Sequence, residues 1–516
     1  MRHLVLVLGD QLSPRSSALA DFDPGSDAIW MAEVDEEATH VWGHKTRLVL
    51  FFSAMRHFRD QLTAMGLRVL YHELSPDPSR DRGASFLDLL RKDLPHLKPH
   101  RVVMTSAGDH RVQADIERAT AESGVPLEVR PDNHFCCSLE EFTDFTSGRR
   151  RTILEDFYRW MRRKHSVLMD QSGNPAGGRW NFDSENRERP PAAGLPSLPA
   201  MPRFPPDGVT REVVKLVEYR FARHPGHCSE FDLPVTREDA LRLLDDFVKN
   251  RLPLFGPYQD CMWRGEPFLY HSRLASALNL KLIDPWECIH AALKSHASKP
   301  VPLPSLEGFV RQILGWREYI RCIYWRHMPG YQFMNHLEHT HPLPSFYWDG
   351  STDMACVQDC MRQLLKHGYT HHIQRLMVLG LFALLYGANP AGFHQWHMAM
   401  YADAVDWVSL PNALGMSQYA DGGIVGTKPY CATGQYIDRM SNYCLACPYD
   451  PIDVLGATAC PFTTFYWDFL DRHAERLEGN PRMTLQLRNL KRRRLDISFM
   501  QGIRRRASEL REAIAG

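Results

Sequence analysis

Apolar and polar positions alternate along the first part of the chain in a pattern typical of strands separated by helices. Short apolar runs recur at residues 4–8, 28–34, 67–74, 101–106 and 125–130. Helical patterns lie between them, most clearly at residues 48–65 and 111–122. This alternation predicts an α/β domain built on a doubly wound parallel sheet, with ligand sites at the carboxyl ends of its strands. We assign residues 1–133 to this domain.

Polar residues follow the first predicted strand directly, in the segment Gly9-Asp10-Gln11. Glu37 and His44 lie in or near the next loops. No Gly-x-Gly-x-x-Gly pattern follows the first strand, so a dinucleotide held there in the usual way is not expected. From the residues alone, helix capping and solvated loops account for these side chains as well as ligand binding does.

Residues 134–210 are predicted to connect this domain to the rest of the chain. A helix expected over residues 142–169 carries a basic face, which suits either phosphate contacts or plain solvation. Proline and glycine crowd residues 170–208 and predict a linker. Within the linker, residues 179–187 combine aromatic and charged side chains, which makes this loop a candidate nucleic-acid contact.

Strand-like runs largely disappear after residue 210. Thr236 opens a helix with a capping sequence, and leucines at helical spacing follow it. We therefore expect residues 211–516 to form an all-helical domain. This region is rich in tryptophan, and for any single tryptophan a place in the core is the simpler interpretation.

Composition narrows the class of protein further. The 516 residues contain 44% hydrophobic and 24% charged residues, with a formal net charge of zero. Affinity for a polyanion must therefore come from local basic runs, such as residues 491–494 and 504–506. The 12 cysteines show no framework spacing, which indicates a reducing compartment. The N-terminus does not read as a signal peptide, and the longest apolar run, residues 376–387, is too short to span a bilayer. We expect a cytoplasmic protein without a membrane segment.

Three cysteines near the C-terminus have the spacing of a metal or cluster site. Cys444 and Cys447 form a Cys-x-x-Cys pair, and Cys460 follows in a loop-like segment. No second Cys-x-x-Cys pair follows, so the fourth ligand must come from a distant segment. This arrangement favours an iron–sulfur cluster over zinc. Buried structural cysteines or a redox pair are the alternatives.

Several longer motifs resemble those of one known family. They are Leu8-Gly9-Asp10-Gln11-Leu12, Phe52-Ser-Ala-Met-Arg-His-Phe58, Tyr270-His-Ser-Arg273, Gly315-Trp-Arg-Glu-Tyr319, Gly368-Tyr-Thr-His-His-Ile-Gln-Arg375 and the stretch from Leu410-Pro-Asn412 to Tyr430. The chain resembles, from end to end, the bacterial iron–sulfur (6-4) photolyases of the photolyase–cryptochrome superfamily. The resemblance implies an α/β antenna-binding domain followed by a helical domain that binds flavin adenine dinucleotide (FAD).

The resemblance also implies the cofactors and their sites. Its [4Fe–4S] cluster would be held by Cys356, Cys444, Cys447 and Cys460, although by composition Cys360 or Cys431 serves equally well as the fourth ligand. The positions implied for FAD are Gly256, Tyr258, His271, Ser272, Arg273, Leu274, Gln312, Trp316, Glu318, Tyr319, Arg375, Asp403, Asp406 and Asn412. The positions implied for an antenna, 6,7-dimethyl-8-ribityllumazine, are Gly9, Asp10, Gln11, Glu37 and His44.

The activity implied is light-driven repair of (6-4) photoproducts in UV-damaged DNA by a monomer. His372 matches the proton-donating histidine, His371 is expected to position it, and Tyr430 belongs to the same catalytic group. Leu376 stands where the animal enzymes carry a second histidine. Trp396 and Trp348 resemble members of an electron-hopping route, with His397 where some relatives carry a tyrosine. Asp183 and Asp260 are acidic positions near the expected lesion face.

Two other functions fit parts of the sequence. A cryptochrome-like blue-light photoreceptor would share the cofactors but not the use of His372 in a lesion pocket. A light-independent nucleic-acid-binding protein with a four-cysteine cluster would lack the flavin, and an absorbance spectrum distinguishes it.

Overall fold

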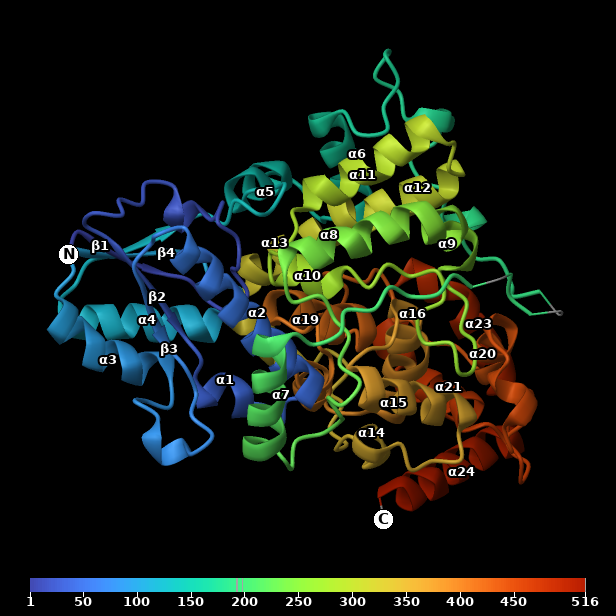
Figure 1. Cartoon of the computed structure of the whole chain (residues 1–516). Helices are drawn as coiled ribbons and strands as arrows, with labels where there is room; N and C mark the ends of the chain where they lie inside the picture. The colour runs from blue at the N-terminus through green and yellow to red at the C-terminus, as the bar shows by residue number, and fades with distance from the viewer. Residues whose placement is uncertain (192–193, 197, 516) are drawn as a thin grey trace.

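A five-stranded parallel sheet organises the N-terminal part of the chain, in the order β3-β2-β1-β4-β5 (Figure 1). The computed structural model describes residues 1–191, 194–196 and 198–515. The strands are β1 His3–Leu6, β2 Ala28–Ala32, β3 Val69–His72, β4 Arg101–Thr105 and β5 Leu127–Arg130. The order runs outward from β1 in both directions, which is the doubly wound topology that the sequence predicts.

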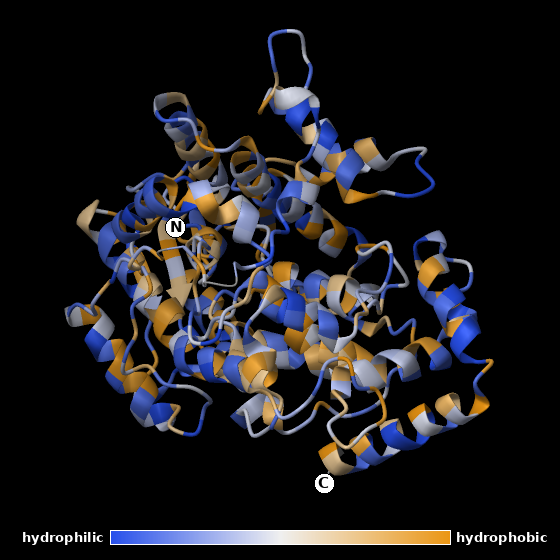
Figure 2. Ribbon diagram, turned by 90° about the vertical axis from the view of Figure 1, so that its right-hand side faces the viewer, coloured by the Kyte–Doolittle hydropathy of each residue, from blue (hydrophilic) through white to orange (hydrophobic). Residues whose placement is uncertain are grey.

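Helices cover both faces of the sheet. They are α1 Asp35–Thr39, α2 Lys45–Ala64, α3 Phe86–Leu97 and α4 His110–Ser123. Successive side chains of a strand point to opposite faces, so Leu4 and Leu6 pack with Leu90 of α3 and Ile116 of α4. Val7, beyond the end of β1, joins the cluster that contains α2. In Figure 2 the strands are mostly orange, as expected for a sheet buried on both faces.

The remainder of the described chain is helical. Its helices are α5 Leu139–Thr146, α6 Leu154–His165, α7 Gly208–Arg220, α8 Arg237–Asp246, α9 Leu252–Tyr258, α10 Ala275–Asn279, α11 Pro285–Ser298, α12 Leu303–Val310, α13 Glu318–His327, α14 Phe346–Asp349, α15 Ala355–His367, α16 His372–Gln374, α17 Leu381–Tyr386, α18 Pro390–Met400, α19 Asp406–Leu410, α20 Gly434–Met440, α21 Pro461–Arg472, α22 Ala474–Leu477, α23 Thr484–Arg493 and α24 Ile497–Ala515. Several continue into π-helical turns, which are η5 Phe247–Arg251, η6 Arg311–Arg317, η8 Arg375–Gly380 and η9 Pro411–Ser417. The 3₁₀ turns are η1 Ser17–Leu19, η2 Pro78–Arg80, η3 Ala176–Gly178, η4 Asp183–Glu185, η7 Gly330–Phe333, η10 Tyr443–Ala446 and η11 Pro481–Met483.

The single helix predicted over residues 142–169 is wrong, because the structure has two helices there. Ser138 and Glu141 form a capping box at the start of α5. Gly148 has a φ of 70°, a left-handed conformation that no helix interior tolerates, and α6 begins only at Leu154. The basic run between the two helices is therefore a loop.

The predicted linker over residues 170–208 contains only the short turns η3 and η4 among its described residues, and residues 192–193 and 197 lie outside them. Arg162 of α6, which is fully buried, anchors the start of this segment. It donates to the carbonyls of Val167, at 3.2 Å, and of Trp180, at 2.8 Å. Three cations of α6 also lie over the Trp180 ring, the nearest being Arg163 at 4.4 Å. The Trp180 side chain is thus covered by the basic helix.

Sheet and helical regions share buried polar contacts. Lys281 pairs with Asp132 at 2.7 Å, and both side chains are buried. The carboxylate of Glu318, on α13, accepts a hydrogen bond of 3.0 Å from the backbone N–H of Cys137. Val7 and Ile29 from the sheet belong to the same hydrophobic cluster as the helices. No helix in the described part of the chain is both long and apolar enough to cross a membrane.

Candidate active site

Several polar side chains of the helical region lie in and after the short connection between α15 and α16. Gly368, with a φ of 60°, ends α15 in the left-handed conformation, and its N–H bonds to the carbonyl of Leu364 at 2.8 Å. The chain then runs extended to His371, and α16 begins at His372 and continues into η8 at Arg375. The turn of helix therefore carries both histidines and the arginine in one short segment.

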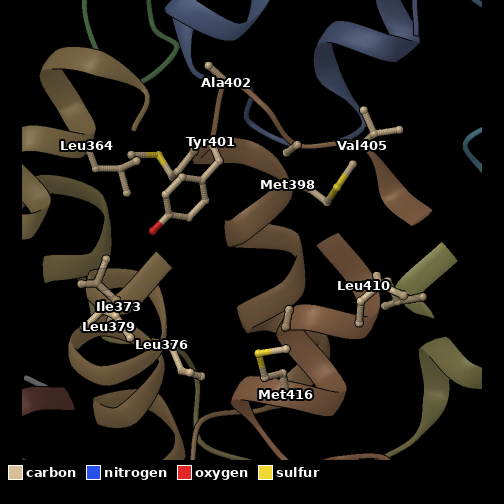
Figure 3. Close-up of a cluster of buried hydrophobic side chains, with 14 of the residues drawn as sticks. Leu364, Ile373, Leu376, Leu379, Met398, Tyr401, Ala402, Val405, Leu410 and Met416 are labelled. Carbon is tan, nitrogen blue, oxygen red and sulfur yellow. The ribbon is translucent and has the colours of Figure 1, made fainter. Parts of the chain in front are cut away.

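Arg375 and Asp403 form a bidentate ion pair, with N···O distances of 3.0 and 3.1 Å. The Nε of Arg375 donates to the carbonyl of Thr370 at 2.7 Å, and its guanidinium lies 3.9 Å from the centre of the Tyr401 ring. Burial is the largest single effect and lowers the pKa of Arg375. The charge and hydrogen bonds of Asp403, together with Tyr401 and Tyr369, outweigh it and raise the pKa. Figure 3 shows Tyr401 among apolar side chains of α15, α16, η8 and α18. The result is a fixed cation in apolar surroundings.

His371 is buried, and its ring stacks on His271 with centres 4.5 Å apart and planes 13° apart. Neither ring nitrogen of His371, nor Nε2 of His271, has a hydrogen-bond partner in the described part of the chain. Burial, reinforced by the neighbouring His372, lowers the pKa of His271 to about 3. Both stacked rings are therefore neutral at neutral pH, and their free nitrogens are available to a bound molecule.

His372 is crowded by protein but keeps an exposed side chain. Burial, and then the nearby Arg375 cation, lowers its pKa to about 4. At neutral pH the imidazole is therefore uncharged and carries a single N–H.

Four cysteines from three distant segments line one cavity. The lining residues are Met354, Cys356, Gly434, Ile437, Tyr443, Cys444, Cys447, Tyr449, Cys460 and Phe462. Cys356 lies on α15, Cys444 in η10, Cys447 just after it and Cys460 at the N-cap of α21. Burial raises the pKa of Cys460 to about 11 and of Cys444 to about 12. In the described chain no group of three or more Cys, His, Asp or Glu side chains is gathered to hold a single metal ion; these thiols surround a space instead.

Trp396 and Trp348 are linked through one peptide group. The indole Nε1–H of Trp396 donates to the carbonyl of Tyr347 at 2.7 Å, and the Tyr347 ring stands edge-on to Trp396 at 4.9 Å. Trp348 follows Tyr347 directly on α14. Trp396 is buried and its ring centre lies 5.8 Å from that of Tyr401. His397, beside Trp396, packs on Tyr401 at 4.5 Å.

Comparison with known proteins assigns the family. A family model for deoxyribodipyrimidine photo-lyase-related proteins matches residues 5–233. A (6-4) photolyase from Agrobacterium fabrum is 44% identical over 483 residues, which is 94% of each chain. The chain belongs to the (6-4) photolyase family.

Solved structures support the same fold for this chain. A bacterial class III photolyase from Agrobacterium tumefaciens matches with a TM-score of 0.55 and 17% identity, covering 85% of this chain and 86% of that one. A cryptochrome from Synechocystis matches with a TM-score of 0.51 and 12% identity, covering 85% and 89%. At these identities the likeness concerns the fold alone. It agrees with the predicted sheet domain followed by a large helical domain.

The segment that the resemblance implies for flavin phosphates begins at His271. Arg273 has a φ of 56° and donates to Asp232 at 2.9 Å, while its Nε has no partner in the described chain. The hydroxyl of Ser272 accepts the N–H of Leu274 at 3.3 Å, just before α10 begins at Ala275. Arg273 is therefore held by one carboxylate and keeps a further donor for an anion.

Other positions implied for the flavin are engaged within the protein. The Tyr319 hydroxyl lies 3.0 Å from the carbonyl of Thr152, and Asn412 donates to the carbonyl of Val408 at 2.8 Å. Glu318 pairs with Arg317 at 2.8 Å as well as with Cys137. These contacts give Tyr319, Glu318 and Asn412 structural roles. Gln312 and Trp316 lie on η6 and remain half-buried, and Tyr258 is buried at the end of α9.

Gly256 and Asp406 are both held closely by neighbours. A Cβ on Gly256 would come within 2.7 Å of the Ser305 hydroxyl, so no larger residue fits there. Asp406 contacts His394 at 3.2 Å and accepts the hydroxyl of Tyr324. Burial, and then the charge of Asp406, raises the pKa of Asp109 to about 7. Asp406 thus faces the sheet domain through Asp109.

The implied antenna positions divide into free and engaged groups. Asp10 is buried with one oxygen unpartnered in the described chain, and burial raises its pKa to about 6. Gln11 donates to the carbonyls of residues 105 and 106 and leaves its own oxygen unpartnered. Glu37 pairs with Arg111 at 2.6 Å. His44 caps α2 through Nδ1 and contacts the Leu365 carbonyl through Nε2, so both of its nitrogens are already used. Gly9 lies against Met55.

Tyr430 lies half-buried beside the loop at residues 179–187. Burial is the main cause that raises the pKa of Tyr430. The Arg187 cation opposes this rise, and the carboxylates of Asp183 and Asp260 add to it. Arg187 pairs with Asp183 and lies 3.9 Å from Asp260, whose pKa burial raises to about 6. The two acidic positions singled out in the sequence therefore share one arginine close to Tyr430.

Sequence reasoning missed Tyr401 and the polar partners of α16. Tyr401 contacts Arg375, Trp396 and His397, so it joins the histidine segment to the tryptophans. Its position between Trp396 and Asp403 was the available signal. Gln374 and Tyr443, which lie 69 residues apart, offered none.

Proposed function

We propose that this protein is a light-driven DNA-repair enzyme that acts on (6-4) pyrimidine–pyrimidone lesions in UV-damaged DNA. Identity of 44% over 94% of the chain to a (6-4) photolyase supports this activity. The observation that carries it is the exposed imidazole of His372, three residues from the Arg375–Asp403 ion pair. A proton donor and a fixed cation in apolar surroundings are what charge transfer to a lesion requires.

FAD is the cofactor that family membership implies, and the residues present fit it. His271 and His371 offer buried nitrogens without partners, and Arg273 offers an unpartnered Nε. Such groups cost free energy unless a ligand satisfies them, so they support a polar ligand in this region. Arg375 and Asp403 would lie at the flavin ring. When bound in its reduced form and excited by light, FAD would supply the electron that is transferred to the lesion.

The residues of this chain then manage the proton. His372 would present an N–H to the flipped-out dinucleotide lesion. Negative charge from bound DNA and cofactor phosphates would oppose the lowering of the His372 pKa by burial and by Arg375. His371, stacked on His271, fixes the backbone from which His372 projects. Arg375 stays charged because Asp403 holds it.

We infer that the four cysteines hold a [4Fe–4S] cluster. Zinc would draw its sulfur ligands to about 2.3 Å from one point. Cys356, Cys444, Cys447 and Cys460 line a shared cavity instead, which would suit a cluster that takes one thiolate on each of its four irons. Metal binding also lowers the raised thiol pKa values, since only thiolates ligate.

We further propose a lumazine antenna at the carboxyl ends of the strands. The unpartnered oxygens of Asp10 and Gln11 could accept hydrogen bonds from the ring N–H or the ribityl hydroxyls of such a molecule. Glu37, held by Arg111, lies in the neighbouring helix α1. We assign residues 1–133 to this antenna domain, 134–210 to the connection and 211–516 to the FAD domain.

The test is His372→Ala on an oligonucleotide that contains one (6-4) lesion. A positioned proton donor contributes about 10²–10⁴-fold, so repair by the reduced, illuminated variant is expected to fall by that factor with FAD content unchanged. His367→Ala is the matched control, because His367 packs on Phe268 at 5.2 Å instead of reaching the proposed lesion pocket. Undiminished repair by His372→Ala with full FAD content refutes the mechanism. No repair by the unmutated protein refutes the function.

A further inference from the structure

Trp42 is an exposed tryptophan of the sheet domain that packs on the helical domain. Its side chain is 46% exposed. The centre of its ring lies 5.3 Å from that of Trp348, with the two planes tilted by 47°. Trp348 itself is only half-buried, so Trp42 extends its ring system to the surface.

The loop that carries Trp42, between α1 and α2, is fixed on the helical domain by backbone contacts. The N–H of His44 donates to the carbonyl of Ala399 at 2.7 Å, and the N–H of Lys45 to that of Pro225 at 3.0 Å. The His44 ring contacts the Leu365 carbonyl at 3.0 Å. Ala399 lies on α18, three residues after Trp396. The distance between the Trp42 ring and the buried tryptophan is therefore held by two well-anchored segments.

A continuous path leads inward from Trp42. It passes from the Trp348 ring along the peptide group to the Tyr347 carbonyl, and from there across a hydrogen bond of 2.7 Å to the indole of Trp396. Trp396 lies 5.8 Å from Tyr401, and the Arg375 guanidinium lies 3.9 Å from the Tyr401 ring. Every step is a ring contact, a covalent link or a short hydrogen bond.

We propose that Trp42 is the surface terminus of the electron route that reduces the flavin, an inference that rests on the proposed function. Trp396 gives one electron to the photoexcited cofactor, Trp348 refills Trp396, and Trp42 refills Trp348. The oxidised Trp42 releases its indole proton to water. A thiol in solution then returns one electron and one proton to Trp42 and leaves as a thiyl radical.

Solvation sets the direction of this transfer. A cationic ring is costly to bury and is stabilised by water. Trp396 is buried, Trp348 half-buried and Trp42 exposed, so each step outward places the positive charge in a more hydrated environment. Charge that reaches Trp42 is also farthest from the flavin along this path, which slows its return.

The experiment compares Trp42→Phe with Trp286→Phe as the matched control. Trp286 stacks on His290 at 5.7 Å and has no ring contact with Trp348 or Trp396 among the described residues. Flash photolysis of the FAD-loaded protein is expected to show a tryptophan radical that decays several-fold faster in Trp42→Phe. Flavin photoreduction in the presence of a thiol is expected to slow several-fold. Trp286→Phe is expected to match the unmutated protein in both.

A readout without cofactor checks the position of the ring. Iodide quenching of the apoprotein's tryptophan fluorescence is expected to lose an accessible component in Trp42→Phe. An unchanged radical lifetime and photoreduction rate in a variant that has lost this component overturns the proposal. Repair by the chemically reduced, unmutated protein is measured alongside. If this repair is absent, the proposed function is refuted. If it is present while Trp42→Phe leaves the radical lifetime and the photoreduction rate unchanged, only the role of Trp42 is refuted.

Discussion

The side-chain amide of Gln374 donates a hydrogen bond of 2.9 Å to the hydroxyl of Tyr443. Gln374 lies on α16, and its own oxygen accepts the backbone N–H of His371 at 3.1 Å. Tyr443 directly precedes Cys444 and lines the cysteine cavity. All of these groups except Cys444 are buried. The cysteine loop is therefore mechanically connected to the segment that carries His372.

The first prediction concerns this connection. Tyr443→Phe leaves one N–H of Gln374 buried without a partner, which is expected to cost about 1–3 kcal/mol of unfolding free energy. Urea unfolding measures the loss, and repair assays are expected to show a lower kcat with FAD and iron content retained. Tyr449→Phe is the control, because Tyr449 lines the same cavity without a bond to Gln374. Equal stability of the two variants contradicts the prediction.

The second prediction concerns the cysteines. Replacing Cys356, Cys444, Cys447 or Cys460 by alanine is expected to abolish iron binding and to yield insoluble protein, because the cluster ties three segments together. Cys360→Ala and Cys431→Ala are expected to keep iron, since neither lines the cavity. Iron analysis after anaerobic purification measures this. Stoichiometric zinc without iron would show that the cluster assignment is wrong.

The third prediction concerns acid stability. His339 and His473 are buried with their Nε2 atoms 2.9 Å apart, and Arg472 donates to the same nitrogen of His473, which must therefore be unprotonated. Burial lowers the pKa of His339 to about 2 and of His473 to about 3. In the unfolded chain both titrate near 6.5. The unfolded state thus binds more protons below that pH.

Stability is accordingly expected to be full above pH ~6.5 and to fall as pH drops below it, by up to about 1.4 kcal/mol per pH unit for each histidine. Urea unfolding between neutral pH and pH ~5 measures the slope. His339→Gln is expected to reduce the slope, whereas His100→Gln, at an exposed position, serves as the control. Parallel slopes in all three proteins would count against a role of this pair.

The fourth prediction concerns the antenna. Glu37→Ala is expected to weaken lumazine binding and to leave FAD content and intrinsic repair unchanged, because the two cofactors belong to different domains. Absorbance of the purified variant reports both cofactors. Glu36→Ala is the control, since Glu36 lies 3.8 Å from the same Arg111 that Glu37 contacts at 2.6 Å. Loss of FAD with lumazine retained reverses the assignment of the domains.

Much of the fold follows from local periodicity. The five apolar runs became the five strands because a sheet buried on both faces needs continuous apolar segments. The break between α5 and α6 was missed because the arginines around Gly148 continue a basic helical pattern, while the φ of 70° at Gly148 ends the helix. The local pattern of apolar and polar residues indicates which side chains of a segment are polar, but it does not determine the backbone torsion angles.

The site was predictable where a motif carried it. The cysteines and the histidine pair were found by spacing and resemblance, and the structure brings all four cysteines to one cavity. The contact of Trp42 with Trp348 and the Gln374–Tyr443 bond were not predicted, because each depends on contacts between segments far apart in the chain. His44 was assigned to the antenna, but both of its nitrogens bond within the protein.

The shared core of the two regions bears on how this protein can be taken apart. Val7 and Ile29 pack in one cluster with the helices. Asp132 pairs with Lys281, and the backbone N–H of Cys137 donates to Glu318, so these groups are bonded to protein instead of water. An isolated fragment of residues 1–133 would expose that apolar face and leave Asp132 without its cation. Replacing this sheet domain by that of a relative therefore requires that the residues in contact between the two regions be transferred together with the domain.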